Sequence, residues 1–217
     1  MPGPARAAVP GPARAAAPSP AAPPAAPPAG SARTRRNDPG RRDRIVAACI
    51  EVIAESGVDG TSHRRVAAAA GVPLGSTTYY FASRDDLLRA AFTRFADTVA
   101  DRFRARLERV APGDREGGAR AVVDIVRRDV FPDARELVLT HELYTLAARD
   151  PRYRELTRAW LDRSRAALER CFDPATARVV DALIEGLTLH HALDGRPHDP
   201  GDVELAVRRL TGTAARA

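Results

Sequence analysis

The sequence predicts an all-α protein, and three observations support this fold class. Apolar residues recur at intervals of three and four positions from residue 41 onward, as they do along the buried face of a helix. No segment alternates apolar and polar residues as a half-buried strand does. Gly, Pro, Ser and Asp stand at the breaks, where helices begin and end. With 217 residues, of which 44% are hydrophobic, the chain can form one large or two small domains with a packed core.

The first part of the chain is compositionally distinct. Residues 1–30 contain ten Pro and twelve Ala, and proline interrupts helical hydrogen bonding, so we expect a disordered tail over residues 1–38 that is not a secretory signal. All 34 basic residues are Arg; residues 1–82 hold 10 Arg against 5 acids, whereas residues 83–217 hold 24 against 23. The excess positive charge in the front part indicates a polyanionic partner, either nucleic acid or a membrane surface.

The first four helices are predicted from periodicity and end signals. The first runs from Arg41 to Ser56, with apolar residues at i, i+3, i+4, i+7 and i+8 from Ile45. Ser62 is a suitable N-cap for a short helix that reaches about residue 70. A second short helix, 74–80, follows Pro73, and Ser83 caps a long helix over about 84–110.

Five more helices are predicted after a loop marked by Pro112-Gly113 and Gly117-Gly118. Asp-Pro pairs open two of them and end another, because proline fits the first turn of a helix but not its interior. The expected ranges are 119–130, 134–148, 152–172, 174–193 and 200–210. The total is about nine helices.

Residues 62–81 have the organisation of a helix-turn-helix. Two short helices that cross closely need a small residue at the crossing, which Ala67 provides. Four positions later, the turn needs a residue that tolerates positive φ, which Gly71 provides. The residues expected to hold the pair together are Val66, Ala70 and Val72, with Thr77 or Tyr80 from the second helix.

The segment TSHRRVAAAAGVPLGSTTYYFASRDDLL resembles the DNA-binding signature of TetR-family regulators. The matching groups are Ala70-Gly71-Val72, Gly75-Ser76, Tyr79-Tyr80-Phe81 and Ser83-Arg84-Asp85-Asp86-Leu87-Leu88. The resemblance implies a TetR-like fold: an N-terminal three-helix DNA-binding domain, residues 39–85, and a C-terminal helical ligand-binding and dimerisation domain, residues 86–217. Pro73 and Leu74 depart from the family pattern, which often has Ser or Thr at the first of these positions and a polar residue at the second. Pro73 cannot donate a backbone hydrogen bond to phosphate, and Leu74 cannot hydrogen-bond a base, although it could pack on a thymine methyl.

The resemblance also implies which residues face DNA. The second short helix would enter the major groove, the first helix and Arg84 would hold phosphates, and Arg64 would reach a base edge or a phosphate. For His63, a solvated position and a phosphate contact are equal alternatives. The implied DNA-binding residues are Arg41, Arg42, Arg44, Ser62, His63, Arg64, Gly75, Ser76, Thr78, Tyr79, Tyr80 and Arg84.

The C-terminal half contains a candidate pocket and a candidate pairing surface. Polar or amphipathic residues on otherwise apolar helices fit a ligand pocket, with ordinary packing as the alternative; they are His141, Tyr144, Trp160, Thr188 and His191. An apolar stripe on the last two helices fits a homodimer interface, with an intramolecular core as the alternative; it comprises Val180, Leu183, Ile184, Leu187, Val203, Val207 and Leu210.

We therefore expect a cytoplasmic dimeric repressor that a small molecule releases from a palindromic operator. A transcriptional activator of the same fold and a non-specific DNA-binding protein remain alternatives. No G-x-S-x-G, P-loop or dinucleotide motif indicates an enzyme, so we expect no catalytic residues and no cofactor. No H-x3-H or C-x2-C pair indicates a metal site, and no apolar run of ~18 residues indicates a membrane span. Cys49 and Cys171 are expected to be reduced and buried.

Overall fold

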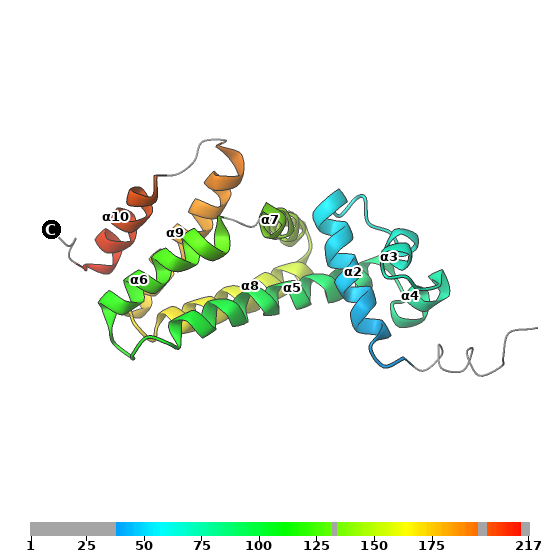
Figure 1. Cartoon of the computed structure of the whole chain (residues 1–217), viewed down its shortest axis with the longest axis horizontal. Coiled ribbons are helices and arrows are strands. Elements are labelled where there is room, and N and C mark those ends of the chain that lie inside the picture. Colours follow the sequence, from blue (N-terminus) through cyan, green and yellow to red (C-terminus); the bar gives the residue numbers. More distant parts are fainter. Residues whose placement is uncertain (1–37, 132–133, 195–198, 214–217) are drawn as a thin grey trace, which may run out of the picture. The chain divides into compact units, whose positions relative to one another are not determined.

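The computed structural model describes residues 38–131, 134–194 and 199–213. Within these ranges the regular elements are all helices (Figure 1), which confirms the predicted all-α class. The nine α-helices there are α2 (Arg41–Ser56), α3 (His63–Ala69), α4 (Leu74–Tyr80), α5 (Arg84–Leu107), α6 (Arg115–Ile125), α7 (Ala134–Arg149), α8 (Pro151–Leu168), α9 (Pro174–Leu193) and α10 (Pro200–Thr211). A short π-helix, η1 (Val126–Val130), continues α6. The predicted tail lies outside the described residues up to position 37.

Side-chain caps start most of these helices where the sequence indicates. Ser62 accepts a hydrogen bond from the Arg65 amide at the start of α3. Ser83 and Asp86 form a reciprocal capping box at the start of α5. Aspartates immediately before prolines cap α8, α9 and α10, so these three boundaries depend on signals within one helical turn.

The predicted loop at Gly117-Gly118 is wrong, because both glycines lie inside α6. Asp114 caps that helix by accepting from the Gly117 amide at 2.8 Å. Gly118 is buried, and a Cβ there would lie 2.6 Å from Cys171 Cβ and 2.8 Å from the Phe172 ring. Position 118 therefore lacks a side chain because α6 packs closely against the turn that follows α8, not because the chain turns at position 118.

Two connected clusters form the core. One joins α2 and α3 to α5, α7 and α8 through residues such as Ile53, Leu87 and Leu143. The other joins the end of α5 to α6, α9 and α10 through residues such as Val122 and Val207. Helix α5 contributes to both clusters and packs along α8 (Figure 1). The first cluster contains residues from both sides of the predicted domain boundary between residues 85 and 86. That boundary stays a prediction.

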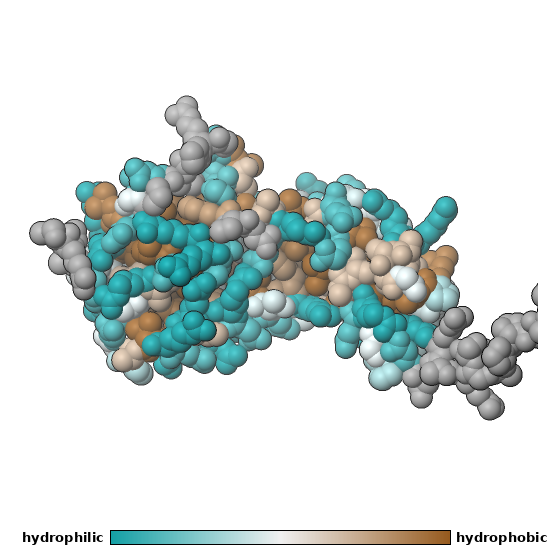
Figure 2. All heavy atoms as spheres, in the orientation of Figure 1, coloured by the Kyte–Doolittle hydropathy of each residue, from teal (hydrophilic) through white to brown (hydrophobic). Residues whose placement is uncertain are grey.

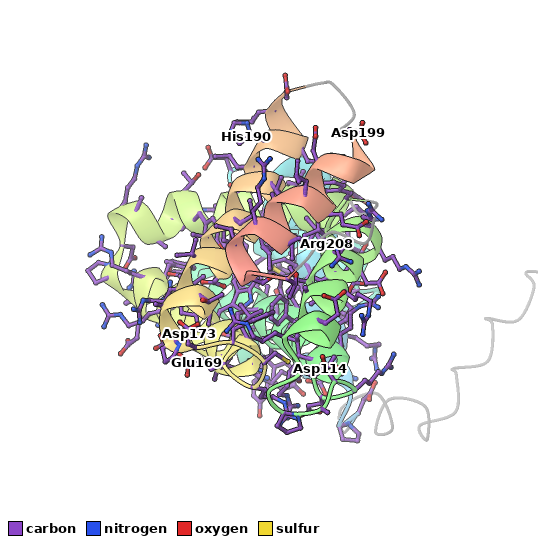
Figure 3. All side chains as sticks on the ribbon, turned by 90° about the vertical axis from the view of Figure 1, so that its left-hand side faces the viewer. Asp114, Glu169, Asp173, His190, Asp199 and Arg208 are labelled. Carbon is purple, nitrogen blue, oxygen red and sulfur yellow. The ribbon has the colours of Figure 1, made fainter. Side chains whose placement is uncertain are left out.

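Arg208 fastens α10 to α6. Its guanidinium is nearly buried and donates to Glu204 at 3.0 Å and to Glu116 at 2.9 Å. Figure 3 shows Arg208 pointing from α10 toward α6. Hydrogen bonds to both carboxylates satisfy a charge that would otherwise be costly to bury.

Candidate nucleic-acid interface and ligand cavity

The α3–α4 unit has helix-turn-helix geometry. Gly71 adopts φ +63°, the left-handed conformation expected of the turn. Ala67 is buried at the crossing, and its carbonyl accepts from the Val72 amide at 3.0 Å. Val66 and Thr77 are fully buried between the helices. The sequence therefore identified both the small residue and the turn residue of this motif.

The outer side of α4 is open. Tyr79 is 81% exposed and makes an edge-to-face contact with the half-buried Tyr80, with ring centroids 5.0 Å apart. Thr78 and Gly75 are exposed, and a Cβ added at Gly75 would meet no atom within 4 Å. Figure 2 shows apolar surface over the α3–α4 unit. Phe81, by contrast, is buried, as expected of a core aromatic.

The predicted phosphate-binding residues differ in their surroundings. Arg42 and Arg44 on α2 are exposed, and the Arg42 guanidinium lies 5.4 Å from the centroid of the Phe81 ring. Arg41 is half-buried, and Arg64 on α3 is exposed.

The remaining predicted residues of α3 and α4 are less open. His63 and Ser76 are half-buried, and the Ser62 hydroxyl caps α3. Ser62 therefore has a structural role whether or not it also meets DNA.

Arg84 holds the loop between α2 and α3. Its Nε donates to the Thr61 carbonyl at 2.7 Å, and another guanidinium nitrogen donates to the Val58 carbonyl. Sequence reasoning placed Arg84 on a phosphate and did not foresee these intramolecular bonds, which join residues 23 and 26 positions apart. Arg65 has a similar local role, donating to the Gly60 carbonyl and the Ser56 hydroxyl.

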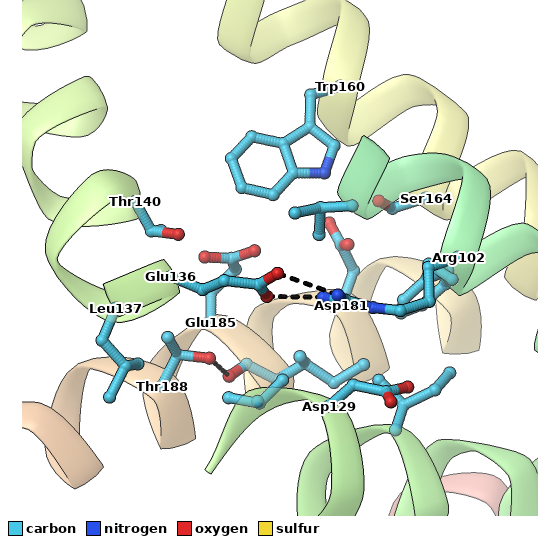
Figure 4. A pocket seen from close by; sticks show the side chains of 15 residues that line it. Arg102, Asp129, Glu136, Leu137, Thr140, Trp160, Ser164, Asp181, Glu185 and Thr188 are labelled. Carbon is cyan, nitrogen blue, oxygen red and sulfur yellow. Dashed lines mark hydrogen bonds and ion pairs between the residues drawn. The ribbon is translucent and has the colours of Figure 1, made fainter. Parts of the chain in front are cut away.

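A cavity of about 60 Å³ lies among α5, α6, η1, α7, α8 and α9. Its apolar walls include Val99, Phe103, Ile125, Leu137, Trp160 and Ile184. Its polar groups are Arg102, three hydroxyls and four carboxyl groups, those of Asp129, Glu136, Asp181 and Glu185. Figure 4 shows carboxyl groups gathered between Trp160 and Thr188, with Arg102 reaching Glu136 across the space.

Three of the four carboxylates have an arginine partner. Arg102 of α5 binds Glu136 of α7 with both terminal nitrogens, at 2.8 and 2.5 Å. Arg106 also binds Asp129 through two hydrogen bonds, but from Nε and one terminal nitrogen, and these bonds raise the pKa of Arg106. Asp181 accepts from Arg165 at 2.9 Å, although burial raises the pKa of Asp181.

Glu185 differs from the other three. Its carboxylate accepts a hydrogen bond from the Tyr144 hydroxyl at 2.7 Å, and it forms no ion pair with any residue in the described ranges. Burial raises the pKa of Glu185 to about 7, and the hydrogen bond from Tyr144 only partly opposes this effect. Burial and the neighbouring carboxylate likewise raise the pKa of Tyr144. The cavity therefore carries one carboxylate that can gain or lose a proton near neutral pH.

Of the five predicted pocket residues, Trp160 and Thr188 line the cavity, and Tyr144 reaches it through Glu185. His141 is half-buried outside the lining, and His191 stacks on Phe131 with ring centroids 4.3 Å apart. Sequence reasoning missed all four carboxylates. Two of them could have been recognised from the sequence. Asp181 and Glu185 stand four positions apart within the apolar stripe of α9, which places two acidic residues on one otherwise apolar helix face.

The predicted pairing stripe divides into buried and accessible residues. Val180, Ile184, Val203 and Val207 lie in the core of the chain itself, which is the alternative that the sequence left open. Leu183 and Leu187 are half-buried, and Leu210 is 38% exposed. The open apolar residues of α9 and α10 also include Val179, Leu189, Leu193 and Leu205.

Within residues 38–131, 134–194 and 199–213, no helix is long and apolar enough to cross a membrane. In the same ranges, no three His, Cys, Asp or Glu side chains are arranged to hold a metal ion. Cys49 and Cys171 are buried free thiols, as predicted.

Two family models match the chain. Residues 45–91 match the bacterial regulatory proteins of the tetR family, and residues 113–213 match the tetracyclin repressor-like C-terminal domain. The curated HTH-type transcriptional regulator PksA of Bacillus subtilis is 28% identical over 183 residues, which cover 71% of this chain and 80% of PksA.

Solved structures agree with these matches. SCO7518 of Streptomyces coelicolor A3(2), a proposed transcriptional regulator, is 52% identical with a TM-score of 0.73, covering 81% of this chain and all of that one. The multidrug binding protein EbrR, complexed with imidazole, is 34% identical with a TM-score of 0.66, covering 83% and 98%. Other structures of EbrR contain proflavin, ethidium or malachite green. The chain therefore belongs to the TetR family of helix-turn-helix transcriptional regulators, which are DNA-binding proteins and not enzymes.

Proposed function

We propose that this protein is a dimeric transcriptional repressor that an organic cation releases from a palindromic operator. The open face of α4 is the observation that carries the DNA-binding part of the proposal. Tyr79, Thr78 and Gly75 offer an aromatic ring, a hydroxyl and a site of close backbone approach on one exposed helix. A helix of this kind inserts into the major groove, where base edges differ in their donors and acceptors.

Arginines on either side of α4 would hold the DNA backbone. Arg42 and Arg44 project from α2, and Arg64 projects from α3. Phosphate contacts set the position of the protein and make its affinity depend on salt, whereas base contacts select the sequence. Arg84, whose guanidinium binds the α2–α3 loop, would act mainly by holding this unit in shape. The site of action would be chromosomal DNA in the cytoplasm.

A second copy of the chain would cover the open apolar residues of α9 and α10. Leu193 is 74% exposed and Val179 is 50% exposed, and several large apolar residues share these two helices. A two-fold dimer would present two copies of α4 to half-sites about 34–36 Å apart, and its symmetry would match a palindrome.

The residues that line the cavity favour an organic cation as the effector. Glu185 provides a negative charge that no arginine neutralises within the described residues, and Trp160 provides an aromatic wall. A cation would pair with the carboxylate and with the indole face. EbrR has been solved in complexes with ethidium, proflavin and malachite green, and each of these dyes is an aromatic organic cation.

Effector binding would require the cavity to widen. Its volume of about 60 Å³ is well below the ~300–1,000 Å³ of pockets for drug-sized ligands. The pair between Arg102 of α5 and Glu136 of α7 bridges two walls of the cavity. A ligand that prefers the widened state would part these helices and shift the population away from the DNA-binding state by its differential affinity.

The DNA-binding part is tested by selecting genomic fragments with purified protein at physiological salt. A regulator recovers one palindromic sequence, whereas a binder that acts through charge alone recovers unrelated fragments with steep salt dependence. Tyr79→Ala should weaken binding to the selected fragment without changing thermal stability, since the side chain is mostly exposed. Arg64→Ala should cost about 1–3 kcal/mol on the preferred sequence if Arg64 reads a base.

The effector part is tested with two ions of the same shape and opposite charge, tetraphenylphosphonium and tetraphenylborate. Trp160 is the only tryptophan and lines the cavity, so its fluorescence reports occupancy directly. We expect the cation to quench Trp160 and the anion to bind at least about tenfold more weakly, since only the cation pairs with Glu185. Glu185→Gln should reduce this preference; equal affinities for both ions in the wild type would contradict a charge-selective site.

A further inference from the structure

The loop between α2 and α3 meets a carboxylate from a distant helix. The Val58 amide donates to Glu142 Oε1 of α7 at 3.2 Å, although 84 positions separate the two residues. Gly57 has φ +67°, and a Cβ at this position would lie 2.5 Å from the same oxygen. The carboxylate therefore rests against backbone that only glycine leaves open.

The same loop is held from its other side. The Val58 carbonyl and the Thr61 carbonyl both accept from Arg84 at the start of α5. The Val58 side chain is buried in the core that α2 shares with α5 and α7. Both peptide groups of Val58 are thus bonded to helices outside the α3–α4 unit. The carbonyl accepts from Arg84 of α5, and within the described part of the chain the amide donates only to Glu142 of α7.

Helix α7 also forms a wall of the cavity. Thr140, two residues before Glu142, lines the cavity, and Tyr144, two residues after it, donates to Glu185. Within a helix, two residues span only ~3 Å along the axis, so these groups move together. Another contact between α7 and α2 is an ion pair of Arg135 with Glu51, but both side chains are more than half exposed, and such pairs add little.

We propose that Glu142 is a positioning residue for DNA binding, which fastens the α2–α3 loop to the cavity helix α7. This inference rests on the proposed DNA-binding function. Through the Val58 amide, the position of α7 sets the position of the loop that leads into α3. A shift of α3 would also move α4, because the two helices pack against each other.

The test compares three variants of the full-length protein. Glu142→Ala removes the acceptor, whereas Glu142→Gln keeps an acceptor oxygen and removes only the charge. Glu55→Ala is the matched control, because Glu55 is an exposed carboxylate near the end of α2 and its loss changes the charge equally. Thermal unfolding of each variant establishes that it is folded.

Two measurements decide the proposal. For the fragment selected by the wild type, we expect Glu142→Ala to bind about fivefold or more weakly, a small coupling between sites, with Glu142→Gln and Glu55→Ala near the wild type. In the free protein, we expect hydrogen exchange of the Val58 amide to speed up about tenfold in Glu142→Ala and not in Glu142→Gln.

Unchanged DNA affinity in Glu142→Ala would overturn the proposal, as would an equal loss in the glutamine variant. An unchanged Val58 exchange rate in Glu142→Ala would also overturn it. If the wild type selects no fragment, the proposed DNA-binding function fails, and exchange at Val58 still shows whether Glu142 holds the loop.

Discussion

Glu185→Gln should make the protein more stable at alkaline pH and leave its stability almost unchanged at acidic pH. The wild-type carboxyl group has its pKa raised from 4.5 to about 7 by burial in the cavity. Between these values the unfolded chain has lost the proton that the folded protein still holds, so unfolding releases a proton. The free energy of unfolding therefore falls as pH rises through this window, and the loss is complete above about pH 7.

The size of the effect follows from the shift. Each pKa unit corresponds to about 1.4 kcal/mol, so the wild type loses about 3 kcal/mol on going from low pH to pH 8. Glutamine has no charge to lose and can still accept the hydrogen bond from Tyr144. The variant should thus be more stable by up to about 3 kcal/mol at pH 8. For a chain of this length, that corresponds to a Tm higher by about 6–12 °C.

The assay is thermal unfolding followed by circular dichroism at pH 5 and pH 8. One protein concentration is used throughout, because the proposed dimerisation would make Tm depend on concentration. All other titrating groups are common to both proteins, so the difference between variant and wild type isolates Glu185. A difference that is the same at both pH values would refute the reasoning. So would a variant that is less stable than the wild type at pH 8, because that result would mean that the carboxylate is favourably paired.

Three further predictions concern the cavity, the packing and the thiols. Affinity for tetraphenylphosphonium should fall about tenfold for each pH unit below 7, because protonation of Glu185 removes the charge that pairs with the cation. Titration of Trp160 fluorescence with the cation at pH 5 to 8 measures this affinity. An affinity that does not change with pH would contradict pairing of the cation with Glu185. Gly118→Ala should destabilise the protein by about 1–3 kcal/mol, because its Cβ would overlap Cys171 and Phe172, whereas Gly75→Ala, which meets no atom, should not lower Tm. Cys49 should react with a thiol reagent only as fast as the protein unfolds. Its side chain is fully buried, and burial raises the pKa of the thiol to about 12, so little reactive thiolate forms. Rapid labelling of the folded protein would contradict this burial.

The sequence by itself determined the helices and the helix-turn-helix. Caps such as Ser62 and Ser83, the glycine of the turn at Gly71, and apolar periodicity all act within one or two helical turns. Their effect on the backbone depends little on the rest of the chain. The motif around Gly71 was also specific enough to predict the family.

Tertiary packing alone decided what covers each helix face. Periodicity marks Val180 and Val207 as apolar, but only the arrangement of α6, α9 and α10 shows that they fill the core of the chain and are not open for pairing. The same holds for Gly118, whose role is close packing and not a turn. A local pattern does not specify the partner of a face, because that partner comes from a distant part of the sequence.

The polar contacts of the candidate sites depend on tertiary packing even more strongly. Glu142 meets the Val58 amide, and Tyr144 meets Glu185, across separations of 84 and 41 residues. The pKa of Glu185 is raised mainly by burial among five other elements, and its neighbours in sequence do not specify that burial. Helices and motif are local consequences of the sequence, whereas the cavity and its link to the DNA-binding unit exist only once the helices have packed.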